Sequence, residues 1–196
     1  MKNFIRLCLA ASVCLAMAVS ACALTPEEAA EMELMSDSGL TAEELAPALG
    51  ELAPYAEDFL AAERETGVNA VFLASLAAFE SGWGRFCRAE NNIFGWSGPS
   101  FSDKGECIAE ISRRIARIYL TFGGACYRGG TLSDVNICYN GSESWFSGMR
   151  AMMAQIGTRA GCETPDAEPA VIGLPFDGDP PVPKMLCAVL TRTAAV

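Results

Sequence analysis

Histidine is missing from all 196 residues of the chain. Its absence excludes Ser-His-Asp and Cys-His catalysis, HExxH metalloproteases and histidine-ligated metal sites. No two cysteines are spaced as CxxC, which argues against a zinc site or a redox dithiol. Carboxylate, tyrosine, lysine and cysteine side chains remain for acid and base chemistry. We therefore expect a protein that works without a metal or an organic cofactor.

Positive charge is scarce as well. The chain has 14 Lys and Arg residues against 24 Asp and Glu residues, and its formal net charge is −10. Nucleic-acid binding requires clustered basic residues, so we expect no nucleic-acid partner. Attraction to an anionic cell wall or membrane would likewise not be electrostatic. Internal repeats are also lacking, and the length suits a single ordinary domain that works as a monomer.

The first 22 residues, MKNFIRLCLAASVCLAMAVSAC, have the layout of a secretory signal. Lys2 and Arg6 form a basic start, and Leu7–Val19 is an apolar run too short to span a bilayer comfortably. The signal can end at a small-x-small cleavage site around Cys22, or in a lipobox whose Cys22 is acylated. An uncleaved membrane anchor is a third interpretation. We expect an exported protein of the cell envelope or medium, which touches a membrane only through a lipid on Cys22.

Six of the nine cysteines lie beyond this leader. An even number of cysteines in an exported chain is typical of disulfides, although the sequence alone does not choose among the pairings. We predict two local bridges, Cys126–Cys138 and Cys162–Cys187. Scattered buried thiols are the alternative.

Helix signals dominate the rest of the chain. Thr25-Pro-Glu-Glu28 and Thr41-Ala-Glu-Glu44 are capping boxes in an N-terminal helical segment, residues 23–48. A main domain is expected over residues 49–160, with an isoleucine-striped helix after a turn-rich aromatic stretch. Residues 161–196 form an acidic, proline-rich extension. The expected fold class is mostly α, with at most a small β-hairpin.

One apolar run, GVNAVFLASLAAFESGWG, ends in a single carboxylate. On a helix, Glu80 shares the face of Leu73 and Leu76, and it lies in the last turn. Burial and the helix dipole both disfavour negative charge there, so both raise the pKa of Glu80. A carboxylic acid that stays protonated near neutral pH suits the general acid of a glycosidase. A helix-end glutamate in open solvent is the alternative.

The stretches AFESGWGRF and ENNIFGW resemble the glucosaminidase family of bacterial peptidoglycan hydrolases, glycoside hydrolase family 73. The similarity runs from about residue 49 to about residue 156. It implies a lysozyme-like helical domain that binds peptidoglycan glycan strands. It also implies an endo-β-N-acetylglucosaminidase, which cuts the β-1,4 bond after N-acetylglucosamine with Glu80 as general acid.

The resemblance also implies roles for other side chains. Asn91 and Asn92 match the paired asparagines of the family, which can bond sugar groups or cap the adjoining turn. Phe94 and Trp96 offer flat faces to a sugar ring, with a core role as the alternative for Phe94. Tyr139, in TLSDVNICYNGSESW, matches a tyrosine that faces the active site in the family. The alternative for Tyr139 is a buried aromatic residue with a bonded hydroxyl.

The second carboxylate of most glycosidases has no clear counterpart here. Asp103 and Glu106 are available, but they suit the N-cap and capping-box partner of the isoleucine-striped helix better. The 2-acetamido group of the substrate can replace the missing acid as nucleophile, and Tyr139 can hold that group. Three rivals stay open: a muramidase or lytic transglycosylase of the same fold, a catalytically silent wall-glycan-binding module, and a structural component of a surface assembly.

Overall fold

The computed structural model describes residues 23–98 and 100–161. Within these ranges 62% of the residues are helical and none forms a strand, which confirms the mostly α fold class, consistent with a lysozyme-like helical domain. The expected leader, most of the C-terminal extension and the Cys162–Cys187 bridge lie outside the described residues. The α-helices are α1 (Pro26–Glu31), α2 (Ala42–Leu45), α3 (Ala56–Thr66), α4 (Ala70–Ser81), α5 (Lys104–Ile115), α6 (Leu132–Tyr139) and α7 (Glu143–Gly161). Between them lie two 3₁₀ helices, η1 (Ala46–Ala48) and η2 (Gly50–Tyr55), and a π-helical turn, η3 (Ala116–Leu120).

Local signals decide where the helices begin and end. Both expected capping boxes are present: the side chains of Thr25 and Thr41 each accept from the backbone N–H three residues later. The side chain of Asn69 accepts from the backbone N–H groups of Val71 and Phe72, the second and third residues of α4. Gly67 ends α3 with a φ of 76°, a left-handed conformation that suits glycine.

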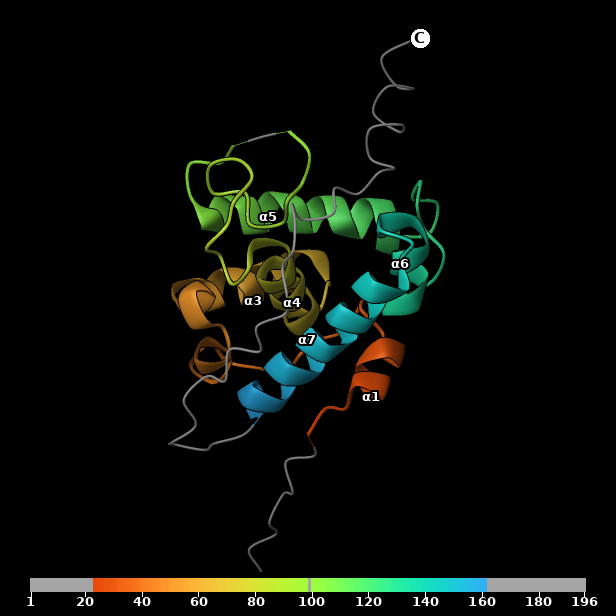
Figure 1. Cartoon of the computed structure of the whole chain (residues 1–196), viewed down its shortest axis with the longest axis horizontal. Coiled ribbons are helices and arrows are strands. Elements are labelled where there is room, and N and C mark those ends of the chain that lie inside the picture. The colour runs from red at the N-terminus through yellow and green to blue at the C-terminus, as the bar shows by residue number, and fades with distance from the viewer. Residues whose placement is uncertain (1–22, 99, 162–196) are drawn as a thin grey trace, which may run out of the picture.

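Helix α4 lies in the middle of the bundle, with α3 beside it and α7 crossing it (Figure 1). Eleven of its residues are buried, from Ala70 to Ser81. A helix that is apolar all round must be enclosed by its neighbours. The N-terminal segment takes part in the enclosure, because α1 and η1 pack on α7 and one core runs from Ala29 to Ala160. The described part of residues 23–48 thus shares its core with the main domain.

A buried glutamate, Glu63 of α3, fastens the start of α4. Its carboxylate accepts from the backbone N–H and the hydroxyl of Ser38, both at 2.8 Å. It also accepts from the backbone N–H of Ala70 at 2.8 Å. Buried carboxylates are retained where such donors satisfy them. Glu63 therefore joins the N-terminal segment, α3 and α4 at one point and sets the direction in which α4 runs toward Glu80.

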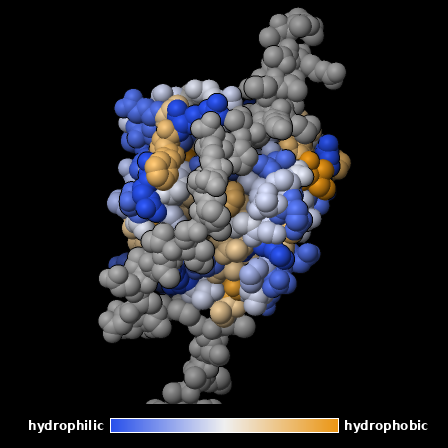
Figure 2. All heavy atoms as spheres, in the orientation of Figure 1, coloured by the Kyte–Doolittle hydropathy of each residue, from blue (hydrophilic) through white to orange (hydrophobic). Residues whose placement is uncertain are grey.

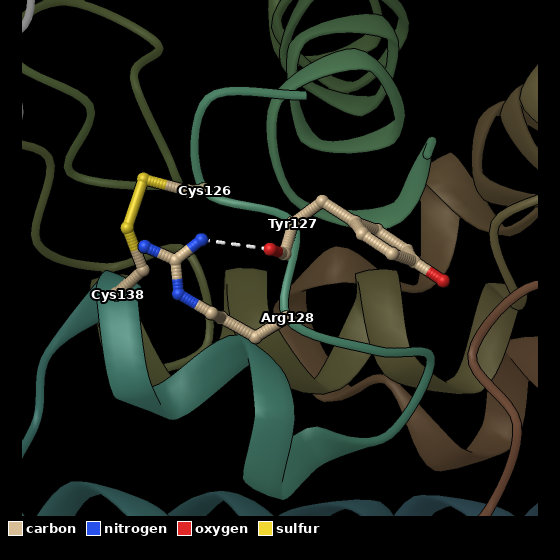
Figure 3. The surroundings of a disulfide bond; sticks show 4 residues. All are labelled: Cys126, Tyr127, Arg128 and Cys138. Carbon is tan, nitrogen blue, oxygen red and sulfur yellow. Dashed lines mark hydrogen bonds between the residues drawn. A yellow bond between two sulfur atoms is a disulfide. The ribbon is translucent and has the colours of Figure 1, made fainter. Parts of the chain in front are cut away.

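The disulfide Cys126–Cys138 is present, as predicted, and joins the segment after η3 to α6 (Figure 3). Between these cysteines, the guanidinium of Arg128 donates to the backbone carbonyl of Tyr127 at 2.7 Å (Figure 3). Cys87 and Cys107 are free thiols, so the expectation that the cysteines beyond the leader form disulfides is wrong for these two. Cys107 lies on the inner face of α5, where the backbone N–H groups of Ile93 and Phe94 hydrogen-bond to its sulfur. It is thus one of the buried thiols that we gave as the alternative.

On the part of the surface that is coloured in Figure 2, apolar residues form small patches among hydrophilic ones. The large apolar side chains that are exposed come from separate parts of the described chain: Met35, Phe86, Phe122 and Ile137. Within residues 23–98 and 100–161, no helix has the length and apolar character needed to cross a membrane.

Candidate active site

Glu80 lies in the last turn of α4, and its side chain is buried, with 4% of its surface exposed. The helix ends at Gly82, whose φ of 55° is left-handed and turns the chain sharply away. The alternative of a glutamate fraying into solvent is therefore wrong. Apolar residues of α4 surround the acid on its own helix, as the sequence predicted.

The carboxyl group of Glu80 has one neighbour that the sequence analysis did not identify. The indole Nε1–H of Trp145 donates to Glu80 Oε1 at 3.0 Å. Burial raises the pKa of Glu80 from 4.5 to about 7, and the hydrogen bond from Trp145 opposes that rise. Near neutral pH the group therefore exists in both protonation states, as a group that gives and then takes a proton must.

Tyr139, the last residue of α6, packs its ring against this tryptophan. Its ring centroid is 5.0 Å from that of Trp145 and 5.5 Å from that of Tyr119. Only 2% of Tyr139 is exposed, and its buried hydroxyl has no hydrogen-bond partner among the described residues. Burial, then the nearby charge of Glu80, raises the pKa of Tyr139, so the phenol keeps its proton. A buried hydroxyl without a partner is costly, and active sites are where such groups are retained.

The loop NNIFG closes over the acid. Asn92 is buried, its amide donates to the backbone carbonyl of Trp96 at 2.7 Å, and its Oδ1 accepts from the backbone N–H of Trp96 at 3.1 Å. These two bonds hold Gly95 at a φ of 60° against Glu80: a Cβ at Gly95 would lie 3.6 Å from Glu80 Oε2. The fold thus brings together the two motifs that carry the family resemblance.

Asn91 closes the same loop at its base. Its amide donates to the backbone carbonyls of Phe101 and Ser102, at 3.0 and 3.1 Å. Asn91 and Trp83 are the non-glycine residues with positive φ in the described chain, at 57° and 65°. One lies in NNIFG and the other in ESGWG. Residues held in this sparsely populated region often lie at functional sites, where the surrounding structure pays their conformational cost.

The sugar-stacking role predicted for Trp96 needs correction, and for Phe94 the structure favours the core role that was the alternative. Both rings are buried in the core, and Trp96 packs edge-on against Tyr119 at 6.4 Å. Neither presents a flat face on which a sugar could stack in this structure. The physical reason is the tight turn that Asn92 closes, because it directs the apolar side chains of the loop into the core, where Trp96 meets Tyr119 of η3.

The two candidate second acids serve the start of α5. Asp103 is the N-cap, and its Oδ1 accepts from the backbone N–H of Glu106 at 2.8 Å. Glu106 turns back to Ser102, one residue earlier than a capping box requires, and accepts from its backbone N–H and its hydroxyl at 2.7 Å. Both carboxylates are thereby held in local hydrogen bonds at the helix start.

No protein-family model matches this chain. No curated protein matches it either. The candidate site therefore rests on its own geometry: a buried acid from α4, an indole donor from α7, a phenol from α6 and a glycine turn beside the acid. The described residues contain no cluster of three His, Cys, Asp or Glu side chains that could hold a metal ion.

Trp145 is the residue that sequence reasoning missed. It stands 65 residues from its partner, Glu80, and nothing within either helix marks the pair. The available signal was its place just after Tyr139, in the segment TLSDVNICYNGSESW that the family resemblance covers.

Proposed function

We propose that this protein is a peptidoglycan hydrolase, an endo-β-N-acetylglucosaminidase, with Glu80 as its general acid. The observation that carries the proposal is the buried carboxyl of Glu80, whose pKa burial raises to about 7. A glycosidase needs an acid that is protonated at the pH at which it works. The contact between Gly95 of NNIFG and Glu80 of ESGWG supports the family resemblance, because it makes the two motifs one site.

The reaction we propose is substrate-assisted. Glu80 donates its proton to the glycosidic oxygen as the bond from that oxygen to the anomeric carbon breaks. The carbonyl oxygen of the 2-acetamido group bonds to the anomeric carbon and forms a cyclic intermediate. Water then opens this intermediate, and the Glu80 carboxylate takes the proton from the water. The overall products are two shorter glycan chains, and Glu80 ends in its starting state.

Tyr139 has a role in this scheme because its hydroxyl is buried near Glu80 and has no partner among the described residues. A phenol that keeps its proton can donate to, or accept from, the acetamido group and hold it against the anomeric carbon. The scheme requires neither a metal nor an organic cofactor. Its substrate lies in the cell wall, which agrees with the export signal expected at residues 1–22.

One observation favours a second candidate, a wall-glycan-binding module without turnover. Asp103 and Glu106, the acids available in the stretch after the NNIFG loop, are both held by local hydrogen bonds at the start of α5. A protein that lacks both a second acid and substrate assistance would bind glycan and leave it intact. Cleavage at a different bond, by a muramidase or lytic transglycosylase, is the other alternative.

Digestion of purified sacculi tests these proposals together. The wild type is compared with Glu80→Gln, which removes the acid, and with Glu106→Gln, which removes a carboxylate that serves only the start of α5. We expect Glu80→Gln to lower the rate by roughly 10²–10⁴-fold, which is the usual rate enhancement from a general acid. Glu106→Gln should keep most of the activity.

Mass spectrometry of the fragments identifies the bond. Reducing-end N-acetylglucosamine supports our proposal, whereas reducing-end N-acetylmuramic acid or its anhydro form indicates the muramidase or transglycosylase. Bound sacculi with no released fragments indicate the binding module. Activity retained by a folded Glu80→Gln variant would overturn the role of Glu80. The wild-type rate should also fall above about pH 7, where Glu80 loses its proton.

A further inference from the structure

Trp145 is almost completely buried although it lies in the first turn of α7. Its side chain is 1% exposed, with the ring of Phe79 edge-on at 6.4 Å and the ring of Tyr139 inclined by 30° at 5.0 Å. Its backbone N–H donates to the hydroxyl of Ser142 at 3.2 Å. The rings of Phe79 and Tyr139 thus restrict the orientation of the indole, and its N–H donates to Glu80 Oε1 at 3.0 Å.

The electrostatic surroundings of Glu80 make this single donor important. A carboxyl group buried at this depth prefers its neutral form, and the indole N–H favours the charged form. The other titratable groups near it are phenols, Tyr139 from α6 with Tyr119 of η3 behind it. The NNIFG loop presents Gly95 to the carboxyl, which carries no charge. Among the described residues, burial and the indole hydrogen bond are the resolved influences on the pKa of Glu80.

We propose that Trp145 is a positioning residue of the active site: its indole N–H orients the Glu80 carboxyl and stabilises the carboxylate that forms when Glu80 gives up its proton. This inference rests on the proposed function. A hydrogen bond to a carboxylate is roughly twice as strong as one to a neutral acid, so the bond strengthens as the proton leaves. Such a donor stabilises the transition state more than the ground state, which is the condition for catalysis.

The same bond supports the second half of the reaction. Once the glycosidic bond is broken, Glu80 waits as a buried carboxylate for the incoming water. Without the indole donor the carboxylate would regain a proton more readily from solvent and would be a poorly oriented base. Trp145 thus influences the acid strength of Glu80 in the first step and its orientation as a base in the second. Trp145 does not itself contact the reacting sugar atoms.

Two replacements of Trp145 test the inference. Trp145→Phe removes the N–H together with part of the ring. Incorporation of β-(3-benzothienyl)alanine at position 145 keeps the bicyclic shape and replaces only the N–H by sulfur, so it separates the hydrogen bond from packing. The pKa of Glu80 is read directly from the infrared C=O band of its protonated carboxyl over pH 4–10, and Glu80→Gln identifies the band. This reading needs no substrate and no turnover.

We expect the pKa of Glu80 to rise by about one pH unit in both variants, because a hydrogen bond to a charged group is worth roughly that much. The turnover of sacculi at pH 5, where Glu80 is protonated in every variant, should fall by roughly 3- to 10-fold, and the alkaline limb of the pH profile should move upward. A merely structural role for Trp145 would lower activity without moving that limb.

An unchanged pKa in the benzothienyl variant would overturn the inference, as would a raised pKa with an unaltered pH profile. Failure of the proposed function looks different: the wild type would release no fragments from sacculi, while the infrared measurement would still decide whether the indole stabilises the carboxylate.

Discussion

The burial of Glu80 predicts that this residue costs the fold stability at neutral and alkaline pH. The pKa of Glu80 rises from 4.5 to about 7 on folding, and burial is the main cause. Between these two values the folded protein holds a proton that the unfolded chain has lost. The unfolded state therefore binds fewer protons, and the free energy of unfolding falls as pH rises through this window.

Each pH unit across the window costs about 1.4 kcal/mol, so the total penalty is about 3 kcal/mol above pH 7. Glu80→Gln carries no charge at any pH and can still accept from the indole of Trp145 through its amide oxygen. We expect the stability of this variant relative to the wild type to increase by about 3 kcal/mol between pH 4 and pH 8. A constant offset between the two proteins does not affect this difference.

Urea denaturation at several pH values, with the disulfide intact, measures the effect. Glu106→Gln is the matched control, because hydrogen bonds from the Ser102 side chain and backbone lower the pKa of Glu106. The pKa shift of Glu106 has the opposite sign, so the wild type gains stability relative to this variant as pH rises from the lowered pKa of the folded state to the ordinary pKa of the unfolded chain, and gains no more above it. If the stabilities of wild type and Glu80→Gln changed in parallel with pH, the carboxyl of Glu80 would not be buried as described, and the argument for a general acid would fail.

Two further predictions concern the neighbours of this acid. Tyr139→Phe removes a buried hydroxyl that has no partner among the described residues, so the variant should gain about 1 kcal/mol of stability in urea denaturation while its activity on sacculi falls; a loss of stability would show that the hydroxyl is bonded. Replacing Cys126 and Cys138 together by alanine opens a bridge of sequence separation 12 and should cost roughly 3 kcal/mol. An unchanged denaturation midpoint would mean that the bridge does not constrain the chain.

Much of the helical framework was predictable because its signals are local. The capping boxes at Thr25 and Thr41 each depend on residues three positions apart, and both occur as expected. The end of α4 was predictable from Gly82, the first glycine of ESGWG, and the start of the same helix from its cap, Asn69. The boundaries of α2 with η1 and of η2 with α3 were less predictable, since prolines within this stretch favour short 3₁₀ turns over one long helix.

Within the site, the sequence predicted the burial of Glu80 correctly, because a helix that is apolar on all sides is enclosed by the rest of the protein. It expected the ring of Trp96 to face a sugar and left the core as the alternative for Phe94, whereas the structure buries both rings. The direction of those rings depends on the turn that Asn92 closes through Trp96, and on which helices lie beneath it. Neither piece of information is present in the residue types themselves.

By itself, then, the sequence determined the helical class, the helix caps and the apolar helix that ends in Glu80, because neighbours along the chain set each of these. Only the tertiary structure decided that the indole of Trp145 would meet that carboxyl, that Tyr139 would be buried nearby with no hydroxyl partner among the described residues, and that Gly95 of NNIFG would lie against Glu80. These contacts join α4, α6, α7 and a loop that lie far apart in the chain, and their hydrogen bonds gain strength only when packing removes water around them.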